Sequence, residues 1–305
     1  IVIFLLILKM MQVLSGSLVA LVTPMEINGG VDFNALENLI EWHIKNGSDG
    51  IVSVGTTGES ATLSTDEHLD VIKHTVKCVN GRIPVIAGSG SNSTAQAIET
   101  TKESLKIGAD YSLLVTPYYN KPSQRGLIEH YTKIANSSDM RLILYNVPSR
   151  TSCDMLPETV EVLSEHNNII GIKEALNSKK RMKQLLNISL KKDGEFLIFS
   201  GDDESFLDLL ILGGHGVISV AANVIPNIIS QICSQFKINQ DETIKLNNKY
   251  KNLYELLFIE SNPVPVKWIL YKIGLIQNSI RLPLIPLDKK YQENITSEML
   301  KLGLL

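Results

Sequence analysis

Short apolar runs recur along the chain at intervals of roughly thirty residues or fewer, the length of one strand-and-helix unit. Most are rich in Val, Ile and Leu, and turn-forming or polar residues follow most of them. Runs of this kind are typical of strands buried on both faces. Eight of them are found, over residues 17–22, 50–54, 84–87, 112–115, 142–145, 169–172, 196–199 and 216–220.

The segments between the runs have the periodicity of amphipathic helices. Residues 33–44, for example, carry apolar side chains at positions 33, 36, 39, 40 and 44, along one face. Ser64 and Glu67 predict a capping box at the start of another helix. Strands alternating with helices form a parallel sheet, and eight units predict a closed (β/α)8 TIM barrel. An open doubly wound sheet is the alternative, but the glycine-rich fingerprint expected after its first strand is missing.

The pattern changes after the eighth run. Residues 228–236, 241–259, 263–273 and 297–302 have helical patterns with no strand between them. We therefore expect a barrel over residues 12–225 and a C-terminal helical region over residues 226–305, packed on the barrel. Residues 1–11 precede both. Their apolar stretch is too short to span a bilayer and lacks the features of a secretory signal. Because Met10 and Met11 follow it, we interpret this stretch as a non-native or mis-called extension, with a membrane-associating tail as the alternative.

The amino-acid composition limits the classes of function that the chain can have. A hydrophobic content of 44% and a charged content of 20% are typical of a globular protein with a large core. The formal charge of −3, with both signs interspersed, predicts no nucleic-acid partner, and we expect no membrane partner. Cys78, Cys153 and Cys233 lie far apart, which favours a reducing, cytoplasmic location over a disulfide framework. The histidines show no ligand spacing, so no metal site is predicted.

Lys173 ends the apolar run 169–172 and is the most informative single residue. Burial among apolar groups favours the neutral amine, which is a nucleophile that can form a Schiff base with a carbonyl compound. The alternative is a lysine that reaches solvent past the strand end and pairs with Glu174.

Other polar residues end neighbouring runs, and in a barrel these ends line one mouth. The segment 55–60, Gly-Thr-Thr-Gly-Glu-Ser, could hold a carboxylate through backbone amides, or be an ordinary turn. Tyr145 could relay protons, or be a core tyrosine. Arg150 could grip a carboxylate, or lie on the surface. The acidic run 202–204 resembles a Mg²⁺ cluster, but we interpret it as the cap of a helix that starts near Ser205.

Several motifs, taken together, resemble those of the dihydrodipicolinate synthase family, within the Schiff-base pyruvate aldolase and lyase superfamily. They are GTTGES at 55–60, VTPYYNKPSQ at 115–124, YNVPSR at 145–150, GIKEA at 171–175, SGDDES at 200–205 and GGHGVISV at 213–220. The resemblance runs from about residue 15 to the end. It implies a lyase of the diaminopimelate route to lysine that condenses pyruvate with L-aspartate 4-semialdehyde. It also implies no separate cofactor, because the Schiff base forms on Lys173 itself.

The resemblance further implies a role for each matching residue. Lys173 would form the imine, and Tyr145 would relay protons. Thr57 would link Tyr145 to a tyrosine from the neighbouring subunit, which matches Tyr119. Thr56 and Thr57 would hold the pyruvate carboxylate, Arg150 the second substrate, and Gly201 and Ile218 would contribute backbone near the lysine. A tyrosine shared across an interface implies a dimer at least, and we expect a homotetramer.

A lysine feedback site is also implied by the resemblance. Ser60, Ala61, His68, Asn92 and Tyr118 match the pattern of feedback-sensitive members. Thr65 and Gln96 depart from it, since a histidine and a glutamate are often found there. Gln96 offers the ligand only a neutral hydrogen bond, so we expect weak or absent inhibition by lysine.

Two other functions remain open from the sequence. One is a pyruvate-dependent lyase that acts on a sugar acid, such as N-acetylneuraminate lyase. The other is a catalytically silent barrel. The Arg150 position and the GTTGES form favour the synthase over the first, and the full set of reactive residues disfavours the second.

Overall fold

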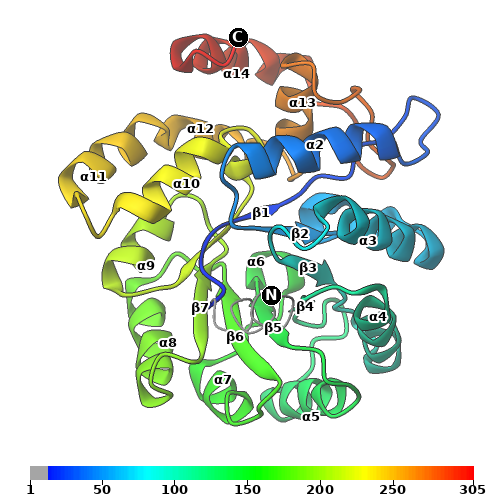
Figure 1. The fold of residues 1–305 in the computed structure, drawn as a ribbon, viewed down its shortest axis with the longest axis vertical. Helices are drawn as coiled ribbons and strands as arrows, with labels where there is room; N and C mark the ends of the chain where they lie inside the picture. The colour runs from blue at the N-terminus through cyan, green and yellow to red at the C-terminus, as the bar shows by residue number, and fades with distance from the viewer. Residues whose placement is uncertain (1–12) are drawn as a thin grey trace, which may run out of the picture.

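The computed structural model describes residues 13–305, so the expected extension over residues 1–11 lies outside the part described. Eight parallel strands close into a barrel in chain order, surrounded by helices (Figure 1). The predicted (β/α)8 barrel is confirmed. The strands are β1 Gly16–Ala20, β2 Gly50–Ser53, β3 Val85–Gly88, β4 Tyr111–Val115, β5 Leu142–Asn146, β6 Ile169–Glu174, β7 Leu197–Ser200 and β8 Gly216–Ser219.

The helices follow the strands as the periodicity predicts. They are α2 Phe33–Lys45, α3 Thr65–Val79, α4 Thr94–Ile107, α5 Gln124–Ala135, α6 Pro148–Thr151, α7 Pro157–Leu163, α8 Lys179–Lys191 and α9 Phe206–Leu212, with short 3-10 turns η1 Thr56–Gly58, η2 Ser60–Thr62 and η3 Ala221–Asn223. The capping box of α3 is confirmed: Ser64 Oγ accepts from Glu67 N at 3.3 Å, and the Glu67 carboxylate accepts from Ser64 N at 2.9 Å.

The C-terminal helices are α10 Pro226–Gln235, α11 Gln240–Lys249, α12 Lys251–Leu256, α13 Val264–Lys272 and α14 Lys289–Leu302. Helix α10 packs against β1 and η3, so it takes the place of the barrel's eighth helix, and α11 to α14 lie beyond it (Figure 1). The boundary expected at residue 225 falls between η3 and α10 and stays a prediction. Among the described residues, no helix combines the length and apolar character that crossing a bilayer requires.

Two apolar layers are built from the strands. Leu18, Ile143, Phe199 and Ile218 pack inside the barrel, whereas alternate residues pack outward against the helices. This alternation decides where the polar residues at the strand ends point. In the register of β5 with β6, Tyr145 pairs with Lys173 and Asn146 pairs with Glu174, one pair for each face of the barrel wall.

Candidate active site

A cavity of about 600 Å³ lies at the carboxyl ends of the strands. The structure brings six of the predicted site residues to its wall: Thr56, Thr57, Tyr145, Arg150, Lys173 and Gly201. These residues lie close together because the parallel strands of a barrel all end at the same mouth.

Lys173 points into this cavity and is 5% exposed. Burial lowers its pKa to about 7; Asp203 opposes this shift and the Arg150 charge adds to it. Its nitrogen lies 4.3 Å from the centre of the Tyr145 ring. The alternative of a solvent-reaching lysine paired with Glu174 is wrong, because Glu174 lies on the other face of the strand and pairs with Arg181. Lys173 is thus a buried amine that is largely neutral at a slightly alkaline pH.

Gly201 follows β7 and lies against the Lys173 side chain. A Cβ placed on Gly201 would come within 2.7 Å of Lys173 Cε and 3.1 Å of Lys173 Cγ. The Gly201 amide also donates to Glu174 O at 2.7 Å, which fixes the approach of the two strands. A larger residue at position 201 would therefore displace the Lys173 side chain from this position.

The Tyr145 hydroxyl is hydrogen-bonded to the Thr56 side chain. Burial raises the pKa of Tyr145, while Arg150 and the Thr56 hydrogen bond work against that rise. This contact differs from the expectation that Thr57 would be the linking residue. The two threonines open the 3-10 turn η1.

Thr57 is held by the C-terminal region instead. Its Oγ1 accepts from Asn262 Nδ2 at 2.9 Å, and Asn262 also lines the cavity. Sequence reasoning missed Asn262, because it lies 205 residues away from Thr57 and carries no motif of its own.

The turn is also anchored by a buried ion pair. Lys267, on α13, pairs with Glu59 and donates to Thr23 O at 3.0 Å. Glu59 has a left-handed backbone, with φ 57°, and its second oxygen accepts from Arg281 N at 3.0 Å. The sequence did hold a signal for Lys267, since it interrupts an apolar helix just as Lys173 interrupts an apolar strand.

The acidic run after β7 is divided between two tasks. Asp202 Oδ2 accepts from Ser205 N at 3.1 Å, in the turn before α9, whose cap residue Ser205 makes no side-chain cap hydrogen bond. Asp203 is buried and does something else: it accepts from Ser219 Oγ at 2.5 Å and from the amides of Val220 and Ala221. Burial raises the pKa of Asp203 to about 6.

Two predicted residues do not line the cavity. Ile218 is buried in the apolar layer inside the barrel, in the same cluster as Tyr145. Tyr119 is 90% exposed and has a left-handed backbone, with φ 74°. Within one chain, Tyr119 therefore faces outward rather than into the site.

The residues of the expected lysine site are spread over neighbouring positions. Ser60, Ala61, Gln96 and Tyr118 line a second cavity of about 440 Å³, which shares Thr56, Arg150 and Asn262 with the first. His68 Nε2 is hydrogen-bonded to Gly88 O at 2.7 Å, and Asn92 Nδ2 donates to Tyr118 O at 3.2 Å. Gln96 Oε1 accepts from Ser91 Oγ at 2.8 Å, so its carbonyl oxygen is already engaged.

One group of possible metal ligands exists in the part of the chain that the structure describes. Glu37 on α2 and His74 and Cys78 on α3 bring their ligand atoms within 4.8 Å of one another. Spacing rules missed this group, because its members come from two helices. It lines a separate surface hollow and shares no residue with the cavity that Lys173 lines.

Comparison with known proteins agrees with this geometry. The sequence profile of the Dihydrodipicolinate synthetase family matches residues 13–301. The 4-hydroxy-tetrahydrodipicolinate synthase of Stutzerimonas stutzeri (strain A1501) is 50% identical over 293 residues, which cover 96% of this chain and 99% of that protein. That of Marinobacter nauticus is 50% identical over 294 residues, covering 96% of this chain and all of that protein.

Solved structures give the same result. The chloride-inhibited dihydrodipicolinate synthase of Acinetobacter baumannii, complexed with pyruvate, superimposes with a TM-score of 0.93 at 48% identity, covering 96% of this chain and 100% of that one. The enzyme of Cyanidioschyzon merolae with lysine bound gives a TM-score of 0.92 at 38% identity, covering 96% of this chain and 99% of that one. The chain therefore belongs to the dihydrodipicolinate synthetase family and is a lyase with 4-hydroxy-tetrahydrodipicolinate synthase activity.

Proposed function

We propose that the reaction runs through a Schiff base between Lys173 and pyruvate. The neutral amine adds to the ketone carbon, and loss of water leaves the imine. Loss of a methyl proton then gives an enamine, whose carbon attacks the aldehyde of L-aspartate 4-semialdehyde and forms the new carbon–carbon bond. The buried amine in the cavity, with a phenol beside it, is the observation that carries this proposal.

The other residues take roles that suit their positions. Tyr145 relays protons during imine and carbon–carbon bond formation, with Thr56 as its hydrogen-bond partner in place of Thr57. Thr56 and Thr57 hold the pyruvate carboxylate, since they open a turn whose first amides are left free by the turn itself. Arg150 binds the carboxylate of the semialdehyde. Gly201 and Ile218 contribute backbone near the lysine.

Tyr119 serves the active site of a partner subunit. A large aromatic side chain that is 90% exposed, held on a strained backbone, suits insertion into another chain. The working enzyme is then at least a dimer, and we expect a homotetramer. Cys78, Cys153 and Cys233 are free thiols, which suits a cytoplasmic location.

Lysine acts weakly or not at all at the second cavity. Ser60, Ala61 and Tyr118 line it, while His68 and Asn92 lie outside its lining, and Gln96 brings no charge to meet an ammonium group. Thr65, at the first position of α3, likewise lacks the imidazole often found there.

Trapping with borohydride tests the proposal. Pyruvate and borohydride should add one reduced pyruvyl group to the protein, located on Lys173 by peptide mass spectrometry, and Lys173→Ala should abolish it. Turnover with L-aspartate 4-semialdehyde should exceed turnover with sugar acids. An absent adduct, or an adduct that persists in Lys173→Ala, would contradict the Schiff base on Lys173.

A further inference from the structure

A polar network lies on the outer side of β5 and β6, directly behind Tyr145 and Lys173. Its members are Asn146, Asp154, Glu174 and Arg181. Asn146 and Glu174 are register partners, one residue beyond Tyr145 and Lys173, so they point to the opposite face of the barrel wall. The chemistry proposed above uses none of the four.

Asn146 joins the two ends of the loop that follows β5. It stands at the start of the loop, where its Nδ2 donates to Asp154 Oδ1 at 2.8 Å. Its Oδ1 accepts from Met155 N at 2.9 Å. One fully buried side chain therefore closes residues 147–154 into a compact loop.

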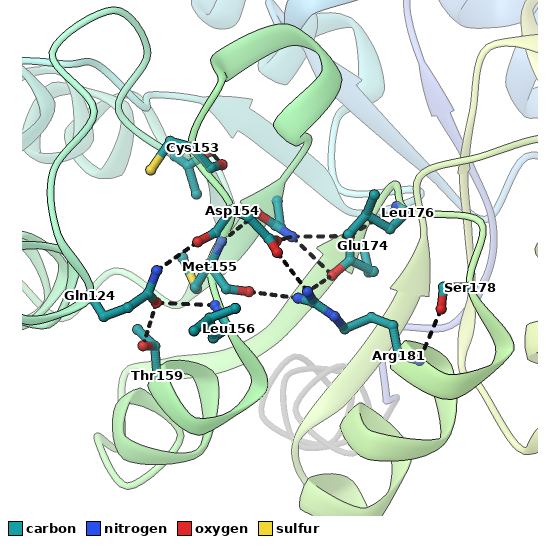
Figure 2. Close-up of polar contacts among 12 residues, drawn as sticks. Gln124, Cys153, Asp154, Met155, Leu156, Thr159, Glu174, Leu176, Ser178 and Arg181 are labelled. Atoms are coloured by element: carbon teal, nitrogen blue, oxygen red, sulfur yellow. Dashed lines mark hydrogen bonds and ion pairs between the residues drawn. The ribbon is translucent and has the colours of Figure 1, made fainter.

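Arg181, in the first turn of α8, fixes this closure to β6 (Figure 2). Its Nη2 donates to Asp154 Oδ2 at 2.7 Å and its Nη1 to Met155 O at 2.7 Å. Nη1 also lies 3.5 Å from Glu174 Oε2. The guanidinium thus bridges the end of the loop and the residue after Lys173. Its side chain is 11% exposed, so water screens these contacts poorly.

The loop carries Arg150 within the four-residue helix α6. Arg150 is exposed at the cavity wall, so its place depends on how the loop ends are held. We propose that Arg181 is a positioning residue for the second substrate: by clamping Asp154 and Glu174 it sets where Arg150 meets the carboxylate of the semialdehyde. This inference rests on the proposed function.

Loss of Arg181 should act on the loop and spare the lysine. Without the guanidinium, the carboxylates of Asp154 and Glu174 face each other across Asn146. Their repulsion should loosen the end of the loop, which Asn146 and Gln124 then hold without Arg181. Lys173 keeps its own anchors, namely strand pairing on both sides of β6 and the Gly201 amide on Glu174 O.

The test measures two quantities, the rate of pyruvate adduct formation and KM for L-aspartate 4-semialdehyde. The variants are Arg181→Met, Arg181→Lys and the control Arg141→Met. Arg141 is an exposed arginine just before β5, at the opposite end of that strand from Asn146, where it donates to the Tyr111 hydroxyl at 3.2 Å. In Arg181→Met we expect KM for L-aspartate 4-semialdehyde to rise about ten-fold or more, with the pyruvate adduct trapped at the wild-type rate. Arg181→Lys should recover part of the loss, and Arg141→Met should match the wild type in both quantities.

Three results would overturn the inference. They are an unchanged KM in a folded Arg181→Met, an equal loss in adduct formation, or the same KM rise in Arg141→Met. If Arg181→Met does not fold, Asp154→Asn decides the question, because it removes the charge that Arg181 holds and keeps the side-chain volume. A wild type that traps no pyruvate would refute the proposed function instead.

Discussion

Lys173 and Tyr145 are register partners on neighbouring parallel strands, and the lysine nitrogen lies 4.3 Å from the centre of the tyrosine ring. The pairing places an amine and a phenol in one cavity without relying on any flexible segment. Strand hydrogen bonds fix both backbones, so the reactive groups are organised before any substrate enters. The predictions below concern this pair and the groups that hold it.

The rate of pyruvate adduct formation should depend on pH through Lys173. Burial lowers its pKa to about 7, so the protonated, unreactive form dominates below that pH. We expect the rate, measured by cyanoborohydride trapping, to rise about ten-fold per pH unit below 7 and to level off above about pH 8. A rate that still climbs between pH 9 and 10 would mean that the amine has an ordinary pKa.

Tyr145→Phe should lower kcat by about two orders of magnitude, because the proton relay loses its hydroxyl. Tyr131→Phe is the matched control. Tyr131 is also fully buried, but its hydroxyl donates to Leu114 O at 3.3 Å, and it does not line the active-site cavity. Steady-state kinetics should show the large loss only at position 145; a near-normal kcat for Tyr145→Phe would remove this residue from the mechanism.

Gly201→Ala should displace the Lys173 side chain, since the new Cβ would meet Lys173 Cε at 2.7 Å. A shift on the order of 1 Å in a reacting group can cost about 100-fold in rate. Adduct formation should therefore fall at least about ten-fold, while circular dichroism stays unchanged. Gly30→Ala, in the turn before α2, serves as the control and should trap pyruvate normally.

Lys267→Met should destabilise the fold by about 3 to 5 kcal/mol, because it leaves the Glu59 carboxylate buried without its cation. The double variant Lys267→Met with Glu59→Gln should recover part of this loss, since no buried charge then remains. Urea unfolding of the two variants measures the difference. If the free energy of unfolding of Lys267→Met lies within about 1 kcal/mol of the wild-type value, the ion pair does not hold the turn.

Lysine should inhibit turnover only at roughly millimolar concentrations or above, because Gln96 gives the ligand a neutral contact. Gln96→Glu should strengthen inhibition by about ten-fold, the scale of adding charge to one hydrogen bond. Steady-state assays with added lysine check both values. Micromolar inhibition of the wild-type enzyme would contradict the inference from Gln96.

The fold could be predicted from the sequence because the strands are buried on both faces. Each strand therefore consists largely of consecutive apolar residues, which can be recognised in the sequence. The same reasoning placed Lys173 and Tyr145 in one site, since both end such runs. It failed where partners are far apart along the chain. The sequence around Thr57 gives no sign of its contact with Asn262. Thr56 and Thr57 are adjacent and identical in type, so a local pattern does not show that one is bonded to Tyr145 and the other to Asn262.

The carboxylates show the same limit. Asp202 and Asp203 are adjacent and alike in sequence, yet one binds the turn into α9 and the other binds the turn after β8. Their roles follow from the direction in which each backbone position points, which a local pattern does not encode. Arg181 follows two lysines in the sequence, and this local pattern does not show that its side chain is largely buried.

The contacts that anchor Thr57 and Glu59 to the C-terminal region have a consequence for protein synthesis. Thr57 and Glu59 leave the ribosome long before Asn262, Lys267 and Arg281, which follow 205, 208 and 222 residues later. All eight strands have thus been made while this turn still lacks its anchors. Competence for catalysis should therefore arrive only when the last part of the chain emerges.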